Sequence, residues 1–285
     1  MRFAYLILAH NNFEQLKMLI KAIDFKDNDI FVHFDIKLGH VDLSQFDNIT
    51  KYASVTFLDD RIDVAWGRVS IVEATLNLLE KASKGNYDYY HMLSGVDFPI
   101  KKNSYIYGFF EKNSGKEFVG FSPIFNENTF KARLSRYHLI NGNKYRRSSF
   151  WRRTNSVLIL LQKVFHIYHY KSVDKFRGGP AWFSITNGLA MELVKNKSKI
   201  LKDYKYVLLP DEIFLQTFIW NSKYKDNLFK NKDDYVACMR KIDWERGNPY
   251  IWKVDDYNEL IEAPHIFARK IDYNLAAKLL SELSE

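Results

Sequence analysis

The sequence predicts a single α/β domain built around a mostly parallel, Rossmann-like sheet flanked by helices. Strand and helix patterns alternate over the first hundred residues, which is typical of a doubly wound sheet. The 285 residues include only 12 Gly and 6 Pro, and no Pro/Gly/Ser-rich stretch or internal repeat divides the chain. Hydrophobic residues make up 47% and charged residues 27%, a balance that excludes a disordered protein.

The individual elements follow from the apolar patterns. Each expected strand is a short apolar run bounded by polar residues, and the expected helices have apolar positions on one face. The first run is seven residues long, too short for a signal peptide with a cleavage site or for a membrane span. The expected strands are 3–9, 30–34, 54–58 and 87–93, and the expected helices between them are 13–23 and 70–84.

Polar residues follow the end of each expected strand. They are His10, Asp35, Asp59 with Asp60, and the run Ser94–Asp97. Ligands of doubly wound sheets bind beyond the carboxyl ends of the strands, so this acid-rich rim is expected to bind a nucleotide. Neither G-x-G-x-x-G after the first strand nor a G-x-x-x-x-G-K-[ST] loop occurs, so side chains must hold that nucleotide.

The cysteine content excludes two classes of protein, and the distribution of charge indicates the kind of partner. A single cysteine, Cys238, excludes an internal disulfide framework and a multi-cysteine zinc site, and favours a reducing compartment. The net charge is 42 − 34 = +8. Between Lys131 and Arg177, twelve Lys/Arg face one acid, Asp174, so this segment carries 12 − 1 = +11 and the remainder −3. The basic charge is a local patch, which points to an anionic partner at one face.

Four blocks, in order along the chain, resemble the core-2/I-branching N-acetylglucosaminyltransferase family. They are FVHFDIK at 31–37, AWGRVSIVEA at 65–74, YYHMLSGVDFPIK at 89–101 and LPDEIFLQT at 209–217. Weaker matches lie at 136–137, 141–142, 179–183 and 267–270, so the resemblance runs from residue 6 to about 272. It implies a GT-A-type fold and inverting transfer of a sugar, expected to be N-acetylglucosamine, from a UDP-sugar. It also implies catalysis without a divalent metal or other cofactor.

The resemblance places the general base at Glu212. Inverting transfer is a single displacement, in which one carboxylate takes the proton of the attacking hydroxyl. The family uses the glutamate of its Pro-Asp-Glu motif, here Pro210-Asp211-Glu212. Asp211 is expected to cap the helix that continues to Trp220. The alternative for both acids is that they only favour a helix N-terminus.

Without a metal, fixed cations must neutralise the departing UDP. The family lysine of the Phe-Ala-x-Lys stretch matches Lys270, whereas its upstream arginine has no clear match, and Lys253 and Arg240 are the nearest candidates. For a lone lysine the alternative is a solvated surface charge. The sole Asp-x-Asp, Asp27-Asn28-Asp29, precedes the second strand and is interpreted as a turn.

His10 and Asp35 match family positions that contact the nucleotide. A carboxylate after the second strand can accept hydrogen bonds from ribose hydroxyls or from the uracil edge. The alternatives are a strand-end histidine with satisfied hydrogen bonds and a turn aspartate.

The acceptor side is expected to combine aromatic rings with charged groups. Arg136 and Trp244 match acceptor-contacting regions of the family, and Trp182 lies in a segment that would line the site. A tryptophan is alternatively a core residue. Asp97 is placed on this side too, with two alternatives: a metal ligand in a metal-dependent member, or a hydrogen bond that orders the loop before Pro99.

The basic segment precedes an apolar stretch from Val157 to Tyr170. Basic residues, Trp151 and an apolar helix fit an element that lies on an anionic membrane. The alternative is an ordinary core helix preceded by a solvated basic loop. No nucleic-acid-binding motif accompanies the patch, so nucleic acid is not an expected partner.

The sequence as a whole therefore predicts one glycosyltransferase domain. Residues 1–125 form its nucleotide-sugar half and residues 126–285 its acceptor and catalytic half. Short bacterial members of the family build surface polysaccharides on lipid carriers, so the expected partners are a UDP-sugar and a lipid-linked glycan. The expected location is the cytoplasm, at the inner face of the cell membrane. Two rivals remain: transfer from UDP-galactose, UDP-glucose or UDP-xylose, and a non-catalytic binding module on the same fold.

Overall fold

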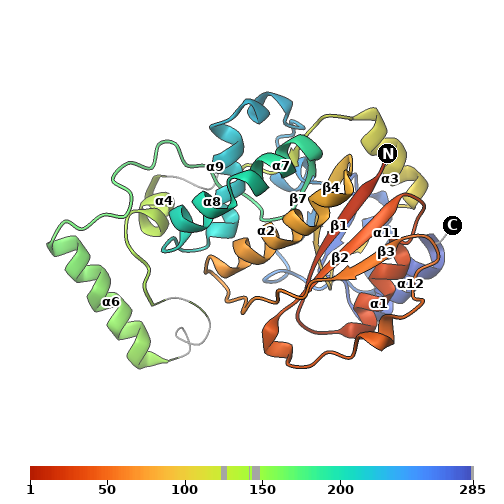
Figure 1. Ribbon diagram of the computed structural model, residues 1–285, viewed down its shortest axis with the longest axis horizontal. Helices are drawn as coiled ribbons and strands as arrows, with labels where there is room; N and C mark the ends of the chain where they lie inside the picture. The colour runs from red at the N-terminus through yellow and green to blue at the C-terminus, as the bar shows by residue number, and fades with distance from the viewer. Residues whose placement is uncertain (123–126, 141, 143–147, 284–285) are drawn as a thin grey trace.

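A six-stranded sheet forms the centre of the protein in a computed structural model that describes residues 1–122, 127–140, 142 and 148–283 (Figure 1). The strand order is β3-β2-β1-β4-β7-β6, with β1 to β4 parallel and β7 antiparallel to β4. The strands are β1 (Phe3–Ala9), β2 (Asn28–Phe34), β3 (Ser54–Phe57), β4 (Tyr89–Ser94), β6 (Phe118–Val119) and β7 (Phe183–Thr186). The predicted α/β class with a mostly parallel sheet is confirmed, and the four predicted strands lie within two residues of their expected limits.

A small second sheet joins the C-terminal part of the chain to the exit of β4. It has the order β5-β9-β8, and Phe98 of β5 pairs with Ala268 of β9. Its strands are β5 (Phe98–Pro99), β8 (Arg240–Ile242) and β9 (Phe267–Arg269). This pairing brings residues 94–99 and 267–270, far apart in the sequence, to the same edge of the main sheet.

Helices cover both faces of the main sheet because its strands are buried on both sides. In β1, Phe3, Tyr5 and Ile7 belong to one apolar cluster, whereas Ala4 and Leu6 belong to the other. The first cluster is completed by α1 (Phe13–Ala22), α3 (Asn103–Lys112), α11 (Tyr257–Glu262) and α12 (Tyr273–Leu283). The second is completed by α2 (Ser70–Ala82), α7 (Asn187–Lys195), α8 (Lys197–Tyr204) and α9 (Phe214–Trp220). Figure 1 shows α1 and α12 on one side of β1 and β2, and α2 and α7 on the other.

The remaining elements are short, except for one. They include the helices α4 (Glu127–Leu134) and α10 (Asp234–Ala237). The 3-10 turns lie at 36–38, 43–46, 83–85, 210–212, 223–227 and 254–256. The expected helix 70–84 ends as an α-helix at Ala82 and finishes in the 3-10 turn at 83–85. The exception is α6 (Ser149–Val164), which projects away from the body of the molecule (Figure 1).

The helix α6 differs from its prediction in extent and in burial. The apolar pattern predicted a helix through Tyr170, but α6 ends at Val164, and Arg152 and Arg153 lie within it rather than in a preceding loop. Leu160 is 58% and Val164 61% exposed, so the core-helix alternative is wrong. Within the described part of the chain, no helix combines the length and hydrophobicity needed to cross a bilayer.

The Asp27-Asn28-Asp29 segment lies at the amino end of β2, opposite the ligand rim, as expected. Only Asp27 adopts a turn conformation, with φ 68°, whereas Asn28 and Asp29 already belong to β2. Asp29 accepts hydrogen bonds from the Tyr87 hydroxyl at 2.7 Å and from the Ser54 backbone at 3.1 Å. The role of Asp29 is therefore structural, and the turn interpretation was wrong for two of the three residues.

Candidate active site

The sequence blocks converge on the carboxyl edge of the parallel strands. The Lys37 ammonium donates to Asp63 at 2.7 Å, which links the first block to the segment before the second. The Leu209 amide donates to the Gly67 carbonyl at 3.1 Å, which links the second block to the fourth. The third block meets residues 267–270 through β5 and β9. Four segments distant in sequence thus surround one region.

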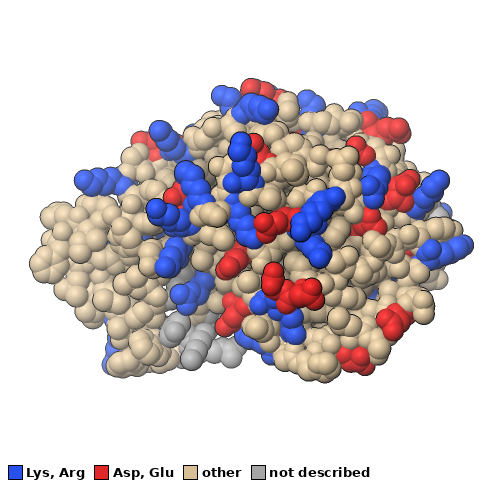
Figure 2. Space-filling view, viewed as in Figure 1, with Lys and Arg blue, Asp and Glu red and all other residues tan. Residues whose placement is uncertain are grey.

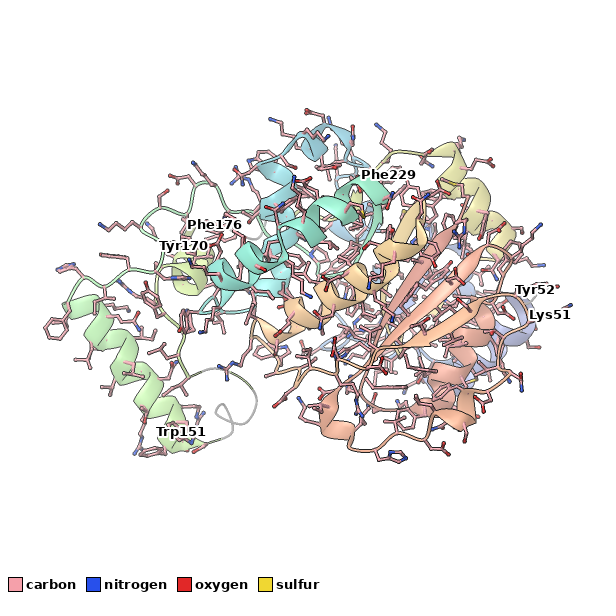
Figure 3. The ribbon with its side chains drawn as sticks, in the orientation of Figure 1. Lys51, Tyr52, Trp151, Tyr170, Phe176 and Phe229 are labelled. Atoms are coloured by element: carbon pink, nitrogen blue, oxygen red, sulfur yellow. The ribbon has the colours of Figure 1, made fainter. Side chains whose placement is uncertain are left out.

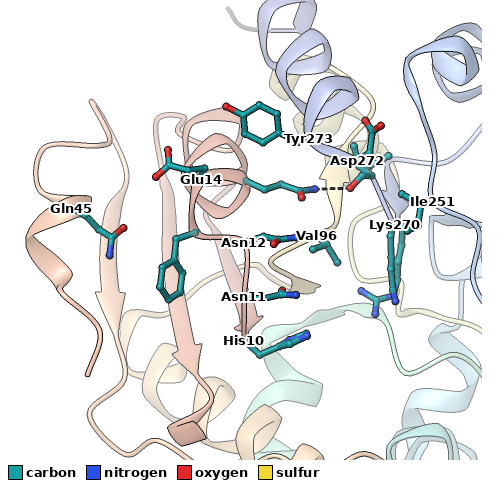
Figure 4. A pocket seen from close by; sticks show the side chains of 14 residues that line it. His10, Asn11, Asn12, Glu14, Gln45, Val96, Ile251, Lys270, Asp272 and Tyr273 are labelled. Carbon is teal, nitrogen blue, oxygen red and sulfur yellow. Dashed lines mark hydrogen bonds between the residues drawn. The ribbon is translucent and has the colours of Figure 1, made fainter. Parts of the chain in front are cut away.

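A cavity of about 830 Å³ opens where β1 ends (Figure 4). The starts of α1 and α12 form one side, and the segment after β9 forms the other. The Gln15 side-chain amide joins the two sides by donating to the Ile271 carbonyl at 2.7 Å. The lining residues are His10–Gln15, Gln45, Val96, Ile251 and Arg269–Tyr273. A cavity of this size accepts a ligand as large as a nucleotide-sugar.

Two adjacent cations line one part of this cavity, and two acids, Glu14 and Asp272, line it as well. Arg269 and Lys270 both line it, and Figure 4 shows His10 and Lys270 pointing into the space from opposite walls. Burial, followed by the charge of Arg269, lowers the pKa of Lys270. Two helix N-termini, those of α1 and α12, add positive potential at the same place. The part of the wall that carries Arg269 and Lys270 therefore suits an anionic group such as a diphosphate.

His10 is close to one acid of the rim, Asp35, and to the cations Arg269 and Lys270. Burial of its ring lowers its pKa; Asp35 opposes this shift, and Arg269, Lys270 and Lys37 add to it. The structure thus brings together three sequence-predicted donor residues: His10, Asp35 and Lys270.

Asp35 has well-defined partners at the end of β2. The side chain is buried, and its Oδ1 accepts the Lys37 backbone N–H at 2.9 Å while Oδ2 pairs with the Lys37 ammonium at 3.0 Å. The turn interpretation of Asp35 therefore describes its local hydrogen bonding.

Asp97 orders the loop after β4. Its carboxylate accepts from the Ser94 backbone N–H at 2.7 Å and from the Ser94 hydroxyl at 2.9 Å, and its side chain is 1% exposed. It also pairs with Arg269 at 2.7 Å, and the Arg269 guanidinium lies 4.2 Å from the centre of the Trp182 ring. Asp97 and Trp182 thus hold Arg269 against the cavity wall. The loop-ordering alternative fits this geometry, and no group of three potential metal ligands occurs among the described residues.

Glu212 is partly exposed and fixed at both main chain and side chain. Its carboxylate pairs with Arg133 at 2.6 Å, with 35% of the Glu212 side chain exposed. Its backbone carbonyl accepts the Gly179 N–H at 3.0 Å, three residues before Trp182. A Cβ on Gly179 would lie 2.2 Å from the Gly120 carbonyl oxygen. Only glycine therefore allows the backbone at residue 179 to lie this close to the backbone at Gly120. A carboxylate held this way can act as a base or as an acceptor of hydrogen bonds from hydroxyls.

Asp211 does not cap the helix, so that prediction was wrong. Pro210–Glu212 forms a 3-10 turn whose N-cap is Leu209, and no side chain caps it or α9. The Asp211 Oδ1 is buried, with no hydrogen-bond partner among the described residues. Burial and the neighbouring Glu212 charge raise its pKa to about 7.

We expect the replacement Asp211→Asn to stabilise the protein at alkaline pH. A carboxyl group is protonated in both states well below its ordinary pKa of 3.8. If its folded-state pKa is raised to about 7, the protein loses stability as pH rises from 3.8 to 7, because the unfolded state then ionises more readily than the folded state. The melting temperature of the variant should exceed that of the wild type by about 2–4 °C at pH 8. Near pH 4 the two melting curves should coincide. The matched replacement of the exposed Asp226 with Asn should show no such pH-dependent gain, and equal curves for Asp211→Asn and the wild type at pH 8 would contradict this assignment.

The expected acceptor residues divide into two groups. Trp244 is 52% exposed, and its side chain is hydrogen-bonded to the Tyr235 hydroxyl. The negative charge of Glu212 also acts on this hydroxyl. Burial raises the pKa of Tyr235 to about 12, so the phenol stays protonated at neutral pH. Arg136 instead stacks 4.2 Å from the Tyr168 ring and donates to the Ile167 carbonyl. Arg136 is therefore tied to the segment that follows α6.

The two further candidate cations lie away from the cavity. Lys253 is exposed, precedes the 3-10 turn at 254–256 and does not line the cavity. Arg240 is 1% exposed and donates to the main-chain carbonyls of Met92, Phe183 and Cys238. Its guanidinium therefore stabilises the junction of the two sheets.

Three residues of this site were not predicted from the sequence: Arg133, Tyr235 and Arg269. Arg269 stands next to Lys270 in the matched stretch, so its position was a usable signal. Arg133 and Tyr235 reach Glu212 only through the tertiary fold, and no pattern in the sequence indicates them.

Comparison with known proteins gives a family match over most of the chain. Residues 3–259 match the family model described as "Branch: Core-2/I-Branching enzyme". Xylosyltransferase 2 of Rattus norvegicus is 25% identical over 305 residues, covering 99% of this chain and 33% of the relative. Xylosyltransferase 1 of Pan troglodytes is 24% identical over 315 residues, covering 99% of this chain and 30% of the relative. The chain spans about a third of the length of these curated relatives.

One solved structure is similar over nearly the full length of both chains. The apo form of mouse xyloside xylosyltransferase 1 aligns with 94% of this chain and 97% of its own, with 11% identity and a TM-score of 0.36.

Proposed function

The chain belongs to the Core-2/I-branching enzyme family of glycosyltransferases, and from this premise we propose that it transfers a sugar from a UDP-sugar to a hydroxyl of a glycan with inversion and without a divalent metal. Its mostly parallel sheet between two layers of helices is a GT-A-type fold, as the sequence predicted. The observation that carries the proposal is the pair of cations, Arg269 and Lys270, in the cavity at the end of β1, near which the blocks that match the family converge.

In the proposed mechanism Glu212 is the general base. It is partly exposed, and its charge acts on Tyr235, which is hydrogen-bonded to Trp244. In this proposal the two aromatic rings would contact the sugar acceptor. The Glu212 carboxylate would take the proton of the acceptor hydroxyl as that oxygen attacks the anomeric carbon. Arg133, paired with Glu212 at 2.6 Å, orients the carboxylate.

Lys270 and Arg269 would stabilise the leaving diphosphate. Their charges face the same cavity, and Asp97 and Trp182 fix the direction of Arg269. Preorganised cations of this kind lower the barrier without having to reorganise during the reaction. His10 and Asp35 would contact the nucleoside at the ends of β1 and β2.

The donor sugar has two leading candidates. N-acetylglucosamine follows from the family resemblance, whereas the names of the curated relatives favour xylose. UDP-galactose and UDP-glucose are the further alternatives. We propose a lipid-linked glycan as the acceptor, in bacterial surface polysaccharide synthesis at the cytoplasmic face of the membrane.

A panel of UDP-sugars tests the proposed function. Purified protein should release UDP from UDP-xylose, UDP-N-acetylglucosamine, UDP-galactose or UDP-glucose, with one donor clearly preferred, even when water is the acceptor. If UDP raises the melting temperature but no donor is turned over with any glycan acceptor, the chain is a binding module and the enzymatic proposal fails.

A further inference from the structure

The α6 arm, residues 148–168, carries an apolar surface that the rest of the described protein leaves uncovered. Of the exposed large apolar side chains among the described residues, nine lie in this arm. They are Phe150, Trp151, Val157, Leu160, Leu161, Val164, Phe165, Ile167 and Tyr168. Figure 3 shows the arm standing clear of the body, with Trp151 at the lower end of α6 in this view.

Four of these side chains form one stripe along α6. Phe150, Val157, Leu161 and Val164 are separated by seven, four and three residues, the spacing that places side chains on one face of a helix. Phe150 is 67% exposed and Val157 54%. Such a stripe of large apolar residues marks an interaction surface in a soluble protein.

The base of the arm is firmly attached to the body. The Gln162 side chain is buried and exchanges two hydrogen bonds with the Tyr137 backbone, at 2.8 and 3.0 Å. The Tyr170 hydroxyl donates to the Asp203 carbonyl at 2.9 Å. The stripe therefore faces outward because the opposite side of the arm is anchored.

The charge of the arm and its surroundings is of one sign. Arg152, Arg153 and Lys163 lie within α6, and the chain from Lys131 to Arg177 has a net charge of +11, with Asp174 as its single acid. Figure 2 shows few charged side chains of either sign, and no acidic one, on the face of the α6 end seen in that view. A second copy of this chain would bring an equally positive surface against the first, which disfavours self-association through the stripe.

We propose that the α6 arm docks on the surface of an anionic lipid bilayer. The stripe enters the boundary between headgroups and acyl chains, while the flanking cations attract anionic headgroups. A tryptophan at the end of such a helix suits the interfacial region, because its ring is apolar and its N–H remains hydrogen-bonded.

Docking would place the catalytic carboxylate near the membrane. The segment that anchors the arm, residues 135–138, directly follows α4, and Arg133 of α4 pairs with Glu212. An acceptor attached to a lipid would thereby reach Glu212 from the bilayer. The docking itself is independent of the transfer chemistry.

Vesicle flotation tests the proposal without any enzymatic readout. Wild-type protein should float with vesicles of phosphatidylcholine and phosphatidylglycerol, should bind phosphatidylcholine alone weakly, and should be released by salt. The triple replacement of Val157, Leu161 and Val164 with Ser should weaken binding about tenfold or more. A control triple replacement of Tyr52, Tyr105 and Met191 with Ser, all exposed elsewhere, should float like the wild type.

Charge is tested by a matched pair of variants. Replacing Arg152 and Arg153 with Ser should weaken binding about fivefold for each cation removed, whereas replacing Lys81 and Lys84 at the end of α2 should not.

Tryptophan fluorescence provides a second measure of membrane contact, taken on the wild-type protein itself. Brominated lipid should quench wild-type tryptophan emission, and the component quenched should disappear in Trp151→Phe. Wild-type protein that fails to float with anionic vesicles would overturn the proposal, as would a wild-type dimer that the Ser stripe variant converts to a monomer.

Discussion

Replacing Glu212 with Gln is expected to lower the sugar-transfer rate by roughly 10²–10⁴-fold while UDP binding stays intact. The amide has the shape of the carboxylate and its oxygen can still accept from Arg133, which pairs with Glu212 at 2.6 Å. It cannot take a proton from the attacking hydroxyl at neutral pH. Steady-state kinetics with saturating donor measure the loss, and calorimetric titration with UDP measures the binding.

A matched control separates base chemistry from a general effect of losing a negative charge. Glu111→Gln, on the exposed end of α3, should keep the wild-type rate. A Glu212→Gln enzyme within a few fold of the wild type would show that another group is the base. A variant that loses both turnover and UDP binding would point to a structural role for the Pro210–Glu212 turn instead.

Replacing Lys270 with Met is expected to lower transfer by roughly 10²–10³-fold and to weaken UDP binding as well. Met retains most of the apolar stem but removes the charge that lines the cavity beside Arg269. Because charge on the departing diphosphate grows in the transition state, the rate at saturating donor should fall along with the affinity.

Lys253→Met is the matched control for Lys270. Lys253 is exposed and lies outside the cavity, so its loss should change the rate by no more than a few fold. If instead Lys253→Met is the more damaging replacement, the diphosphate lies elsewhere than in the cavity at the end of β1.

The four parallel strands of the sheet were predictable because they are buried on both faces. Runs such as Phe3–Ala9 and Tyr89–Ser94 are nearly continuous in apolar residues, and the patterns of α1 and α2 between the strands have clear helical periods. The exposure of the apolar side chains of α6 was not predictable. Its apolar residues have the same spacing as those of a core helix, and only the fold shows that nothing among the described residues covers them.

The candidate site was predictable where the chemistry is attached to a strand end or to a contiguous motif. His10, Asp35 and Lys270 fall in one neighbourhood for that reason. The partners of Glu212 were not predictable, because Arg133 and Tyr235 reach it from α4 and α10, which lie 79 residues before and 23 after it. Asp211 was misassigned as a cap because an acid after proline suits a helix start. The fold instead buries its Oδ1 without a partner.

The measurement that tests the central claim most directly is the rate of UDP release by the wild-type enzyme, with its preferred UDP-sugar and acceptor, after exhaustive treatment with EDTA. If Lys270 and Arg269 neutralise the leaving diphosphate, this rate should equal the rate in the presence of Mg²⁺ or Mn²⁺. Activity that vanishes in EDTA and returns with Mn²⁺ would contradict the account and show that a metal ion, not Lys270 and Arg269, supports departure of UDP.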